Sequence, residues 1–157
     1  MDGDFKAQFS YVYDYVNNNG TYERKNIDEN VIDSQVFQIK GMTSDCVSLV
    51  HVLSNYIGNI EDGEIRKIYL LPTDPELYKI NVTKIKKERN KTPAGEFNTI
   101  KVQLKADLGF ISIVLSAFVP PTYVWYVKEY PHQWIQYEGM DGGMKSANIR
   151  ATLTGVR

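Results

Sequence analysis

The chain has 157 residues, with 18 basic and 19 acidic side chains and a formal net charge of −1. This length fits a single domain, which we expect to span residues 1–157. An apolar fraction of 43% with 24% charged residues excludes wholesale disorder. A domain that binds a nucleic-acid backbone usually carries a basic excess, so the near-neutral charge argues against a nucleic-acid partner. The single cysteine, Cys46, excludes a disulfide within the chain.

Residue types that favour strands dominate the composition. Val, Ile, Thr, Tyr, Phe and Trp together number 56, whereas Ala and Leu together number 15. The first group suits a pleated, half-buried surface, and the second contains the strongest helix formers. The composition therefore predicts a mainly β fold.

The first predicted strand covers residues 9–16, where four aromatic side chains occupy alternate positions and should share one face. An Asn-Asn-Asn-Gly turn follows at residues 17–20, because these residues tolerate positive φ. Residues 110–119 are apolar on both faces, which predicts a central strand that is covered on each side. The other predicted strands span residues 22–27, 34–39, 64–71, 77–86, 97–105, 123–128, 134–138 and 147–153.

One amphipathic helix is predicted over residues 44–57. Its apolar side chains recur at helical spacing, and Gly58 follows as a residue that can end a helix in the left-handed conformation. A single helix among strands most simply packs its apolar stripe on a sheet. We therefore expect a curved antiparallel sheet or open β-barrel of nine to eleven strands, with this helix packed against it. The stripe consists of Cys46, Leu49, Val50, Leu53 and Ile57.

Few residues suit catalysis or metal binding. The chain has two histidines, His51 and His132, and neither belongs to a zinc-binding spacing. No glycine-rich phosphate loop precedes a helix. We therefore expect no metal, no cofactor and no catalytic residues. The alternative is an enzyme whose site is assembled from scattered polar residues, with His132, Glu138 and Asp141 as the candidates.

Charged residues cluster at residues 84–91, where five of eight residues are basic. Such a run can contact an anionic membrane or a nucleic acid. It also lies between two predicted strands, where a solvated hairpin tip is expected. We favour the hairpin tip.

Aromatic residues gather in the last third of the chain. Consecutive strands over residues 110–119, 123–128 and 134–138 should lie side by side, so that residues on one face converge. If the concave face of the sheet encloses a cavity, it should bind an apolar, lipid-like ligand or a partner. The alternative is that the same side chains are close-packed core residues. The candidates for this site are Phe118, Tyr123, Trp125 and Trp134.

Residues 91–102, Lys-Thr-Pro-Ala-Gly-Glu-Phe-Asn-Thr-Ile-Lys-Val, resemble the recurring motif of a bacterial family catalogued as domain of unknown function 3108. The flanking order is similar as well, with a Gly-containing turn at residues 61–64 before the motif and an aromatic strand at residues 123–127 after it. The resemblance covers residues 34–157. It implies an exported β domain of the cell envelope, in which a curved sheet wraps a helix as in lipoprotein-carrier folds. The family has no established catalytic residues, so none is carried over.

The first residues have neither a basic start nor an apolar run, so we expect no signal peptide in this chain. The longest apolar stretch, residues 110–121, is too short to span a bilayer, so we expect no transmembrane segment. The protein is then cytoplasmic, or it is the mature form of an exported protein. The resemblance favours the periplasm or cell envelope. We expect a non-catalytic envelope protein that binds a lipid-like molecule or an envelope protein, with a purely structural interaction module as the further alternative.

Overall fold

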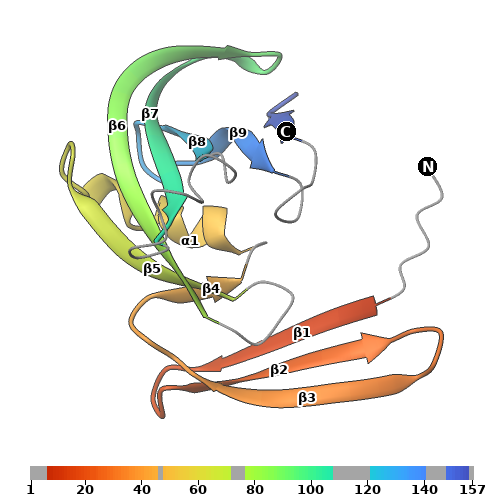
Figure 1. The fold of residues 1–157 in the computed structure, drawn as a ribbon. Coiled ribbons are helices and arrows are strands. Elements are labelled where there is room, and N and C mark those ends of the chain that lie inside the picture. Colours follow the sequence, from red (N-terminus) through yellow and green to blue (C-terminus); the bar gives the residue numbers. More distant parts are fainter. Residues whose placement is uncertain (1–6, 46–47, 72–76, 108–120, 141–147, 156–157) are drawn as a thin grey trace.

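The computed structural model describes residues 7–45, 48–71, 77–107, 121–140 and 148–155. These residues form ten strands in two sheets and one short α-helix (Figure 1). The larger sheet is strongly curled, and the helix packs on it. The predicted class, a mainly β fold with a curved antiparallel sheet and one principal helix, is therefore confirmed.

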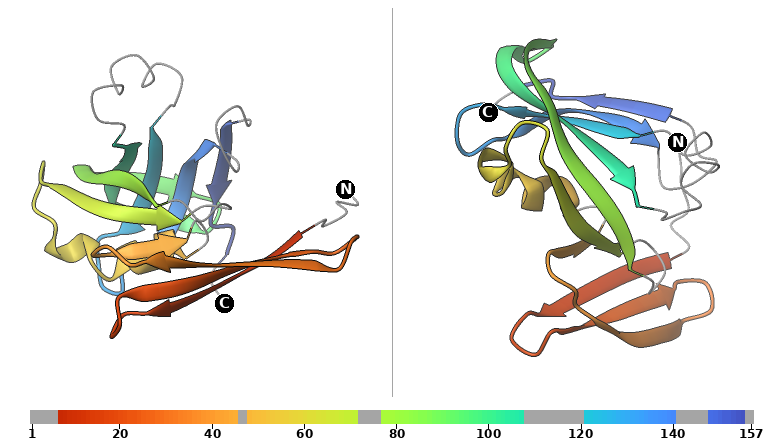
Figure 2. Two further views of the ribbon diagram at one scale, coloured as in Figure 1. Left: turned by 60° about the horizontal axis from the view of Figure 1, so that its bottom comes forward. Right: turned by 60° about the vertical axis from the view of Figure 1, so that its left-hand side comes forward.

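The first three strands form a sheet of their own, with β1 (Ala7–Asp14), β2 (Asn19–Asn26) and β3 (Val31–Gln38) in sequence order and antiparallel. The two turns contain Asn18 and Asn30, both with positive φ, a conformation that asparagine tolerates well. Gly20 lies opposite Phe37, and a Cβ at Gly20 would lie only 2.4 Å from the Phe37 ring. Glycine is therefore required where this ring crosses β2. We call this unit the N-terminal sheet; it forms a separate layer beside the larger sheet (Figure 2).

The larger sheet has seven strands in the order β10-β9-β8-β7-β6-β5-β4. All neighbours pair antiparallel except β4 and β5, which are parallel. Its strands are β4 (Thr43–Asp45), β5 (Ile65–Leu71), β6 (Tyr78–Thr92), β7 (Gly95–Ala106), β8 (Thr122–Val127), β9 (Trp134–Met140) and β10 (Asn148–Thr152).

Strands β6 and β7 form a long hairpin that arches over the rest of the sheet (Figure 1). A β-bulge between Lys84 and Lys86 divides it, and bulges bend and twist the strand that carries them. The tight turn at its tip depends on Gly95, whose φ of +138° is a conformation that other residues rarely adopt.

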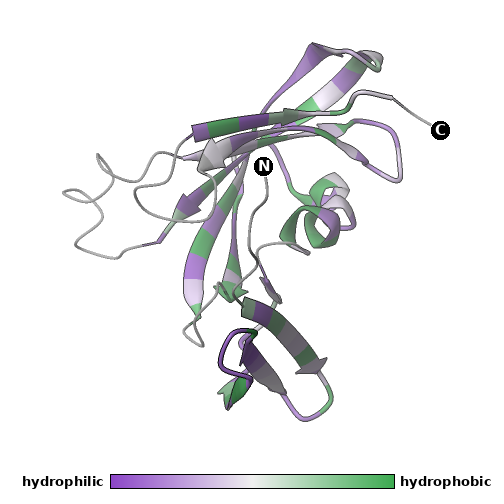
Figure 3. Ribbon diagram, turned by 90° about the vertical axis from the view of Figure 1, so that its right-hand side faces the viewer, coloured by the Kyte–Doolittle hydropathy of each residue, from purple (hydrophilic) through white to green (hydrophobic). Residues whose placement is uncertain are grey.

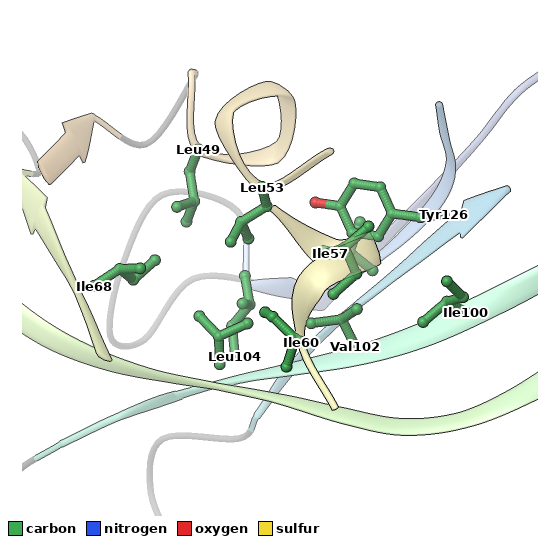
Figure 4. Packing of buried hydrophobic residues seen from close by; sticks show 11 residues of the cluster. Leu49, Leu53, Ile57, Ile60, Ile68, Ile100, Val102, Leu104 and Tyr126 are labelled. Carbon is green, nitrogen blue, oxygen red and sulfur yellow. The ribbon is translucent and has the colours of Figure 1, made fainter. Parts of the chain in front are cut away.

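The main core lies between the larger sheet and the helix α1 (Leu49–Ser54), which continues into a 3-10 turn (Ile57–Asn59). Leu49, Leu53 and Ile57 turn toward the sheet, where Val102 and Leu104 meet them (Figure 4). Along β6 and β7, hydrophobic and hydrophilic residues alternate, so each strand presents one apolar face (Figure 3). We call the side of the sheet that packs on α1 the helix face, and the opposite side the far face.

The helix differs from its prediction at both ends. Ser44 and Asp45 belong to β4, a short strand that the sequence did not indicate, and Cys46 lies outside the described residues. The helix ends at Ser54, and Gly58 lies in the 3-10 turn without positive φ, so the predicted left-handed glycine end is wrong. The packing of the stripe is correct for Leu49, Leu53 and Ile57, which are buried.

The predicted central strand over residues 110–119 lies outside the described residues. No helix in the described part of the chain is long and apolar enough to cross a membrane.

Candidate functional site

Two of the predicted site residues, Tyr123 and Trp125, lie on β8 and point to the far face. Their neighbours Val124 and Tyr126 alternate with them and are fully buried in the main core on the helix face. Strand β8 pairs with β7 on one side and β9 on the other, so it is interior to the sheet. The two rings lie next to each other, with centroids 6.2 Å apart. Because both residues belong to one strand, their proximity follows from alternation and does not test the predicted convergence of neighbouring strands.

Trp125 is enclosed by its neighbours. Only 5% of its surface is exposed, and its indole N–H donates a 2.8 Å hydrogen bond to Oε1 of Glu88 on the arched hairpin. The Lys101 ammonium lies 4.5 Å from the Trp125 ring centroid and 4.3 Å from the Tyr123 ring centroid, in cation–π contact with both. The Tyr123 hydroxyl accepts a hydrogen bond from Gln103. Trp125 thus has little surface left for a ligand.

The Glu88 carboxylate links Trp125 to the hairpin. Its second oxygen, Oε2, forms a 2.6 Å ion pair with Lys86. Burial raises the pKa of Glu88, but hydrogen bonds from Lys86 and Trp125 outweigh burial, so the net pKa lies below its ordinary value. This carboxylate is therefore held ionised, as an acceptor in a structural network rather than as a general acid. We call Lys86, Glu88, Lys101, Tyr123 and Trp125 the arch network.

Trp134 lies apart from this network. It packs against the main core on the helix face, and its ring meets His51 of α1 edge-on at 6.4 Å. The two tryptophans therefore lie on opposite faces of the sheet, and the structure does not bring them together. Phe118, the fourth predicted residue, lies outside the described residues.

The residues proposed for an enzyme site are also separated. His132 precedes β9; its Nδ1 is 3.1 Å from the Val127 carbonyl oxygen, and its ring packs against Gly58. Glu138 lies toward the other end of β9, in a 3.2 Å ion pair with Arg150. Asp141 lies outside the described residues. Among the residues that the structure describes, no three His, Cys, Asp or Glu side chains could hold a metal ion together.

The basic run at residues 84–91 forms part of β6 rather than a hairpin tip. Most of its cations are paired: Lys86 with Glu88, Lys87 with Asp62 and Arg89 with Glu96. Lys84 is buried, and its ammonium donates to the Ile60 carbonyl oxygen at 2.8 Å. Lys84 and Lys87 therefore tie the hairpin to residues 60–62, and the other two ion pairs lie within the hairpin.

The hollows in the described part of the surface are open or small. An open groove of about 500 Å³ runs beside the Glu138–Arg150 ion pair on the far face. A cleft of about 100 Å³ lies next to α1 between Leu53, Tyr56 and Ile68. The cleft is much smaller than the roughly 300–1,000 Å³ typical of small-molecule pockets.

The N-terminal sheet presents an exposed apolar surface that the sequence did not reveal. Val12, Thr21 and Val36 lie side by side across its three strands, and Val12 and Val36 are 62% and 76% exposed. They lie on the side opposite Tyr22 and Phe37, which pack against Leu71 of the larger sheet. Alternation predicted which residues share a face, but it did not reveal which face would remain uncovered.

Polar contacts hold one end of the N-terminal sheet to the body of the protein. The Tyr15 hydroxyl donates to the Thr43 carbonyl oxygen at 2.9 Å, and the Tyr13 hydroxyl lies 3.4 Å from Oδ2 of Asp45. Burial, followed by the Asp45 charge, raises the pKa of Tyr13, so the hydroxyl remains a proton donor. The backbone N–H of Ser48 donates to the other Asp45 oxygen. These polar contacts therefore lie at the Tyr13 end of β1 and add to the packing of Tyr22 and Phe37 on Leu71.

Comparisons with family models, with curated proteins and with solved structures each found no match to this chain.

Proposed function

We propose that this protein is a non-catalytic binding protein whose partner docks on the N-terminal sheet. The observation that carries the proposal is the distribution of exposed apolar side chains. Fourteen large apolar side chains are exposed among the described residues, and eight of them fall within residues 9–36. Three of them, Val12, Ile32 and Val36, share the uncovered face of the sheet, and exposed apolar groups gathered on one face are typical of an interaction surface. The eight are Phe9, Val12, Tyr15, Val16, Ile27, Val31, Ile32 and Val36.

The geometry supports a macromolecular partner better than a lipid-like ligand. Trp125 is enclosed by Glu88 and Lys101, and Trp134 packs into the main core. The apolar cleft beside α1 measures about 100 Å³. The uncovered face of the N-terminal sheet, where Val12 and Val36 are exposed, instead offers an apolar surface that another protein can cover.

For the compartment, we propose the cell envelope. The support is the resemblance of residues 91–102 to the envelope family, together with the antiparallel, curled sheet that the resemblance implies. Fractionation of cells that express the native gene tests this proposal. Recovery in the periplasmic or envelope fraction is expected, and recovery in the cytoplasm alone would contradict it.

Site-specific photo-crosslinking in cells tests the docking surface. A photoreactive amino acid replaces Val36 on β3 of the N-terminal sheet or, as the control, Ile85 at the bulge of β6, which is also exposed. We expect a discrete crosslinked protein band with the probe at position 36 and none with the probe at position 85. Equal labelling at both positions, or no adduct at either, would contradict the proposal.

A further inference from the structure

Among the residues that the structure describes, none pairs with the outer edge of β3, which is therefore open there. Strand β2 pairs with one edge of β3, and no strand in the described part of the chain pairs with the other. All residues of β3 except Phe37 are exposed. Natural sheets usually protect such an edge with lysine, proline, a bulge or a covering segment. From Val31 to Gln38 the strand contains no proline and a single charged residue, Asp33, so it lacks the protection expected of a solvent-facing edge.

The hydrogen bonds of the N-terminal sheet show which backbone groups face this open edge. The Ile39 N–H donates to the Asn18 carbonyl oxygen at 2.9 Å, so residue 39 forms a hydrogen-bonded pair with β2. Hydrogen-bonded and non-hydrogen-bonded pairs alternate along an antiparallel ladder. Odd-numbered residues of β3 therefore bond to β2, and the N–H and C=O groups of Ile32, Ser34 and Val36 point outward.

The residues of β3 are complementary to those of a second β3 strand that runs antiparallel to it. In an antiparallel pair centred on Ser34, Ile32 lies opposite Val36 on one face. On the other face Val31 lies opposite Phe37, and Asp33 lies opposite Gln35. Apolar residues meet apolar ones, and the only charge does not meet its own copy. Moving the register by two residues places Ile32 opposite Ser34 or Gln38, so this match belongs to one register.

We propose that β3 pairs with β3 of a second copy of this chain, antiparallel and centred on Ser34. This proposal rests on the proposed function and names its partner. The opposing pairs Ile32–Val36, Ser34–Ser34 and Val36–Ile32 each exchange two backbone hydrogen bonds. The arrangement is a closed two-fold pair, because the same edge is used by both copies.

The side chains add an apolar contact to this ladder. Val36 has Thr21 and then Val12 behind it on the same face, and Ile32 of the second copy continues that row. Because the pair has two-fold symmetry, the dimer contains two such rows. Val12, Val36 and Ile32, which are exposed in one copy, are therefore brought together on one face of a six-stranded sheet.

Sedimentation velocity over a wide concentration range tests the pairing. We expect wild type to shift from monomer to dimer as concentration rises. Val36→Lys should raise the dissociation constant about tenfold or more, because it removes the apolar contact with Ile32 of the second copy and places at the edge a lysine that opposes pairing. The control is Val16→Lys, at a 90% exposed position in the β1–β2 turn, which should leave it unchanged. Wild type that stays monomeric, or a dimer that Val36→Lys does not weaken, would overturn the proposal.

Disulfide trapping tests the register. In a Cys46→Ser background, Ser34→Cys should form a covalent dimer on mild oxidation, because opposing residues of a ladder lie within disulfide reach. Ser10→Cys on β1 is the matched control and should not. Trapping at Ser10 but not at Ser34 would overturn this register. A different protein crosslinked at position 36, with no dimer of this chain, would refute the pairing but leave the proposed function standing.

Discussion

Asn90 and Gln136 lie 46 positions apart in the chain, and the Asn90 side-chain amide donates a 3.2 Å hydrogen bond to the side-chain oxygen of Gln136. Asn90 is on β6 and Gln136 on β9, with two strands between them in the sheet. The contact is possible only because the hairpin arches over the far face. Gln136 is 1% exposed, so its amide depends on this contact rather than on water.

Asn90→Ala should therefore destabilise the protein by about 1–3 kcal/mol, the cost of leaving a buried acceptor unpaired. Urea denaturation measures the change. Asn98→Ala, at an exposed position on the same hairpin, is the control and should stay within about 0.5 kcal/mol of wild type. Equal losses in the two variants would contradict the role of the arch contact.

The arch network should make stability depend on acid pH. The folded-state pKa of Glu88 lies below its ordinary value of 4.5, so its contribution is present above that pH and is lost as pH falls through the folded-state pKa. Chemical denaturation at several pH values should show the free energy of unfolding of wild type converging on that of Glu88→Gln below about pH 4.5. Trp125→Phe removes one hydrogen bond to the carboxylate, so it should move this loss to higher pH. A constant gap between wild type and Glu88→Gln at all pH values would contradict this assignment.

Lys84 and Lys87 both contact Asp62, but only Lys84 is buried. Lys84→Met removes the donor to the Ile60 carbonyl oxygen and should destabilise the protein by about 1–3 kcal/mol in thermal or urea denaturation. Lys87→Met changes an exposed ion pair and should cost less than about 1 kcal/mol. A larger loss of stability in Lys87→Met than in Lys84→Met would contradict the assignment of Lys84 as the residue that holds β6 to the segment after α1.

Titration with an apolar ligand tests the aromatic binding site that the sequence predicted. The enclosure of Trp125 leads us to expect no saturable change in tryptophan fluorescence on titration with a fatty acid, in wild type or in Trp134→Phe. Trp134→Phe leaves Trp125 as the only tryptophan, so its signal is read alone. Saturable quenching of Trp125 would show that the arch opens to admit a ligand.

Sequence patterns predicted the faces of individual strands well. In β8, Tyr123 and Trp125 share one face, as strand alternation requires, and the core residues Val124 and Tyr126 occupy the other. The same reasoning failed for Trp134, because a β-bulge between Trp125 and Tyr126 shifts the register of β9. Without the bulge Trp134 would lie opposite Val127 and share the face of Trp125; with it, Trp134 lies opposite Tyr126 and packs on the helix side. Hydrophobic periodicity does not reveal a bulge.

Two other features depend on contacts between distant segments. Strand β4 has the sequence Thr-Ser-Asp and forms because it pairs in parallel with β5 and is buried, not because its residues favour strands. Strand β6 continues through its basic run to Thr92, since Asp62 and Glu96 neutralise two of its cations. The pattern of residues along one strand reveals neither its pairing with a distant strand nor its neutralisation by distant charged residues.

Backbone amide exchange, measured by NMR in dilute and concentrated solution, tests most directly whether the open edge of β3 is a docking surface. If β3 pairs with a second copy, the amides of Ile32, Ser34 and Val36 should exchange more slowly in concentrated solution, because they gain hydrogen bonds to that copy. The amides of Asp33 and Gln35 already bond to β2 and should change little. Exchange at Ile32, Ser34 and Val36 that does not depend on concentration would contradict the pairing of β3 with a second copy.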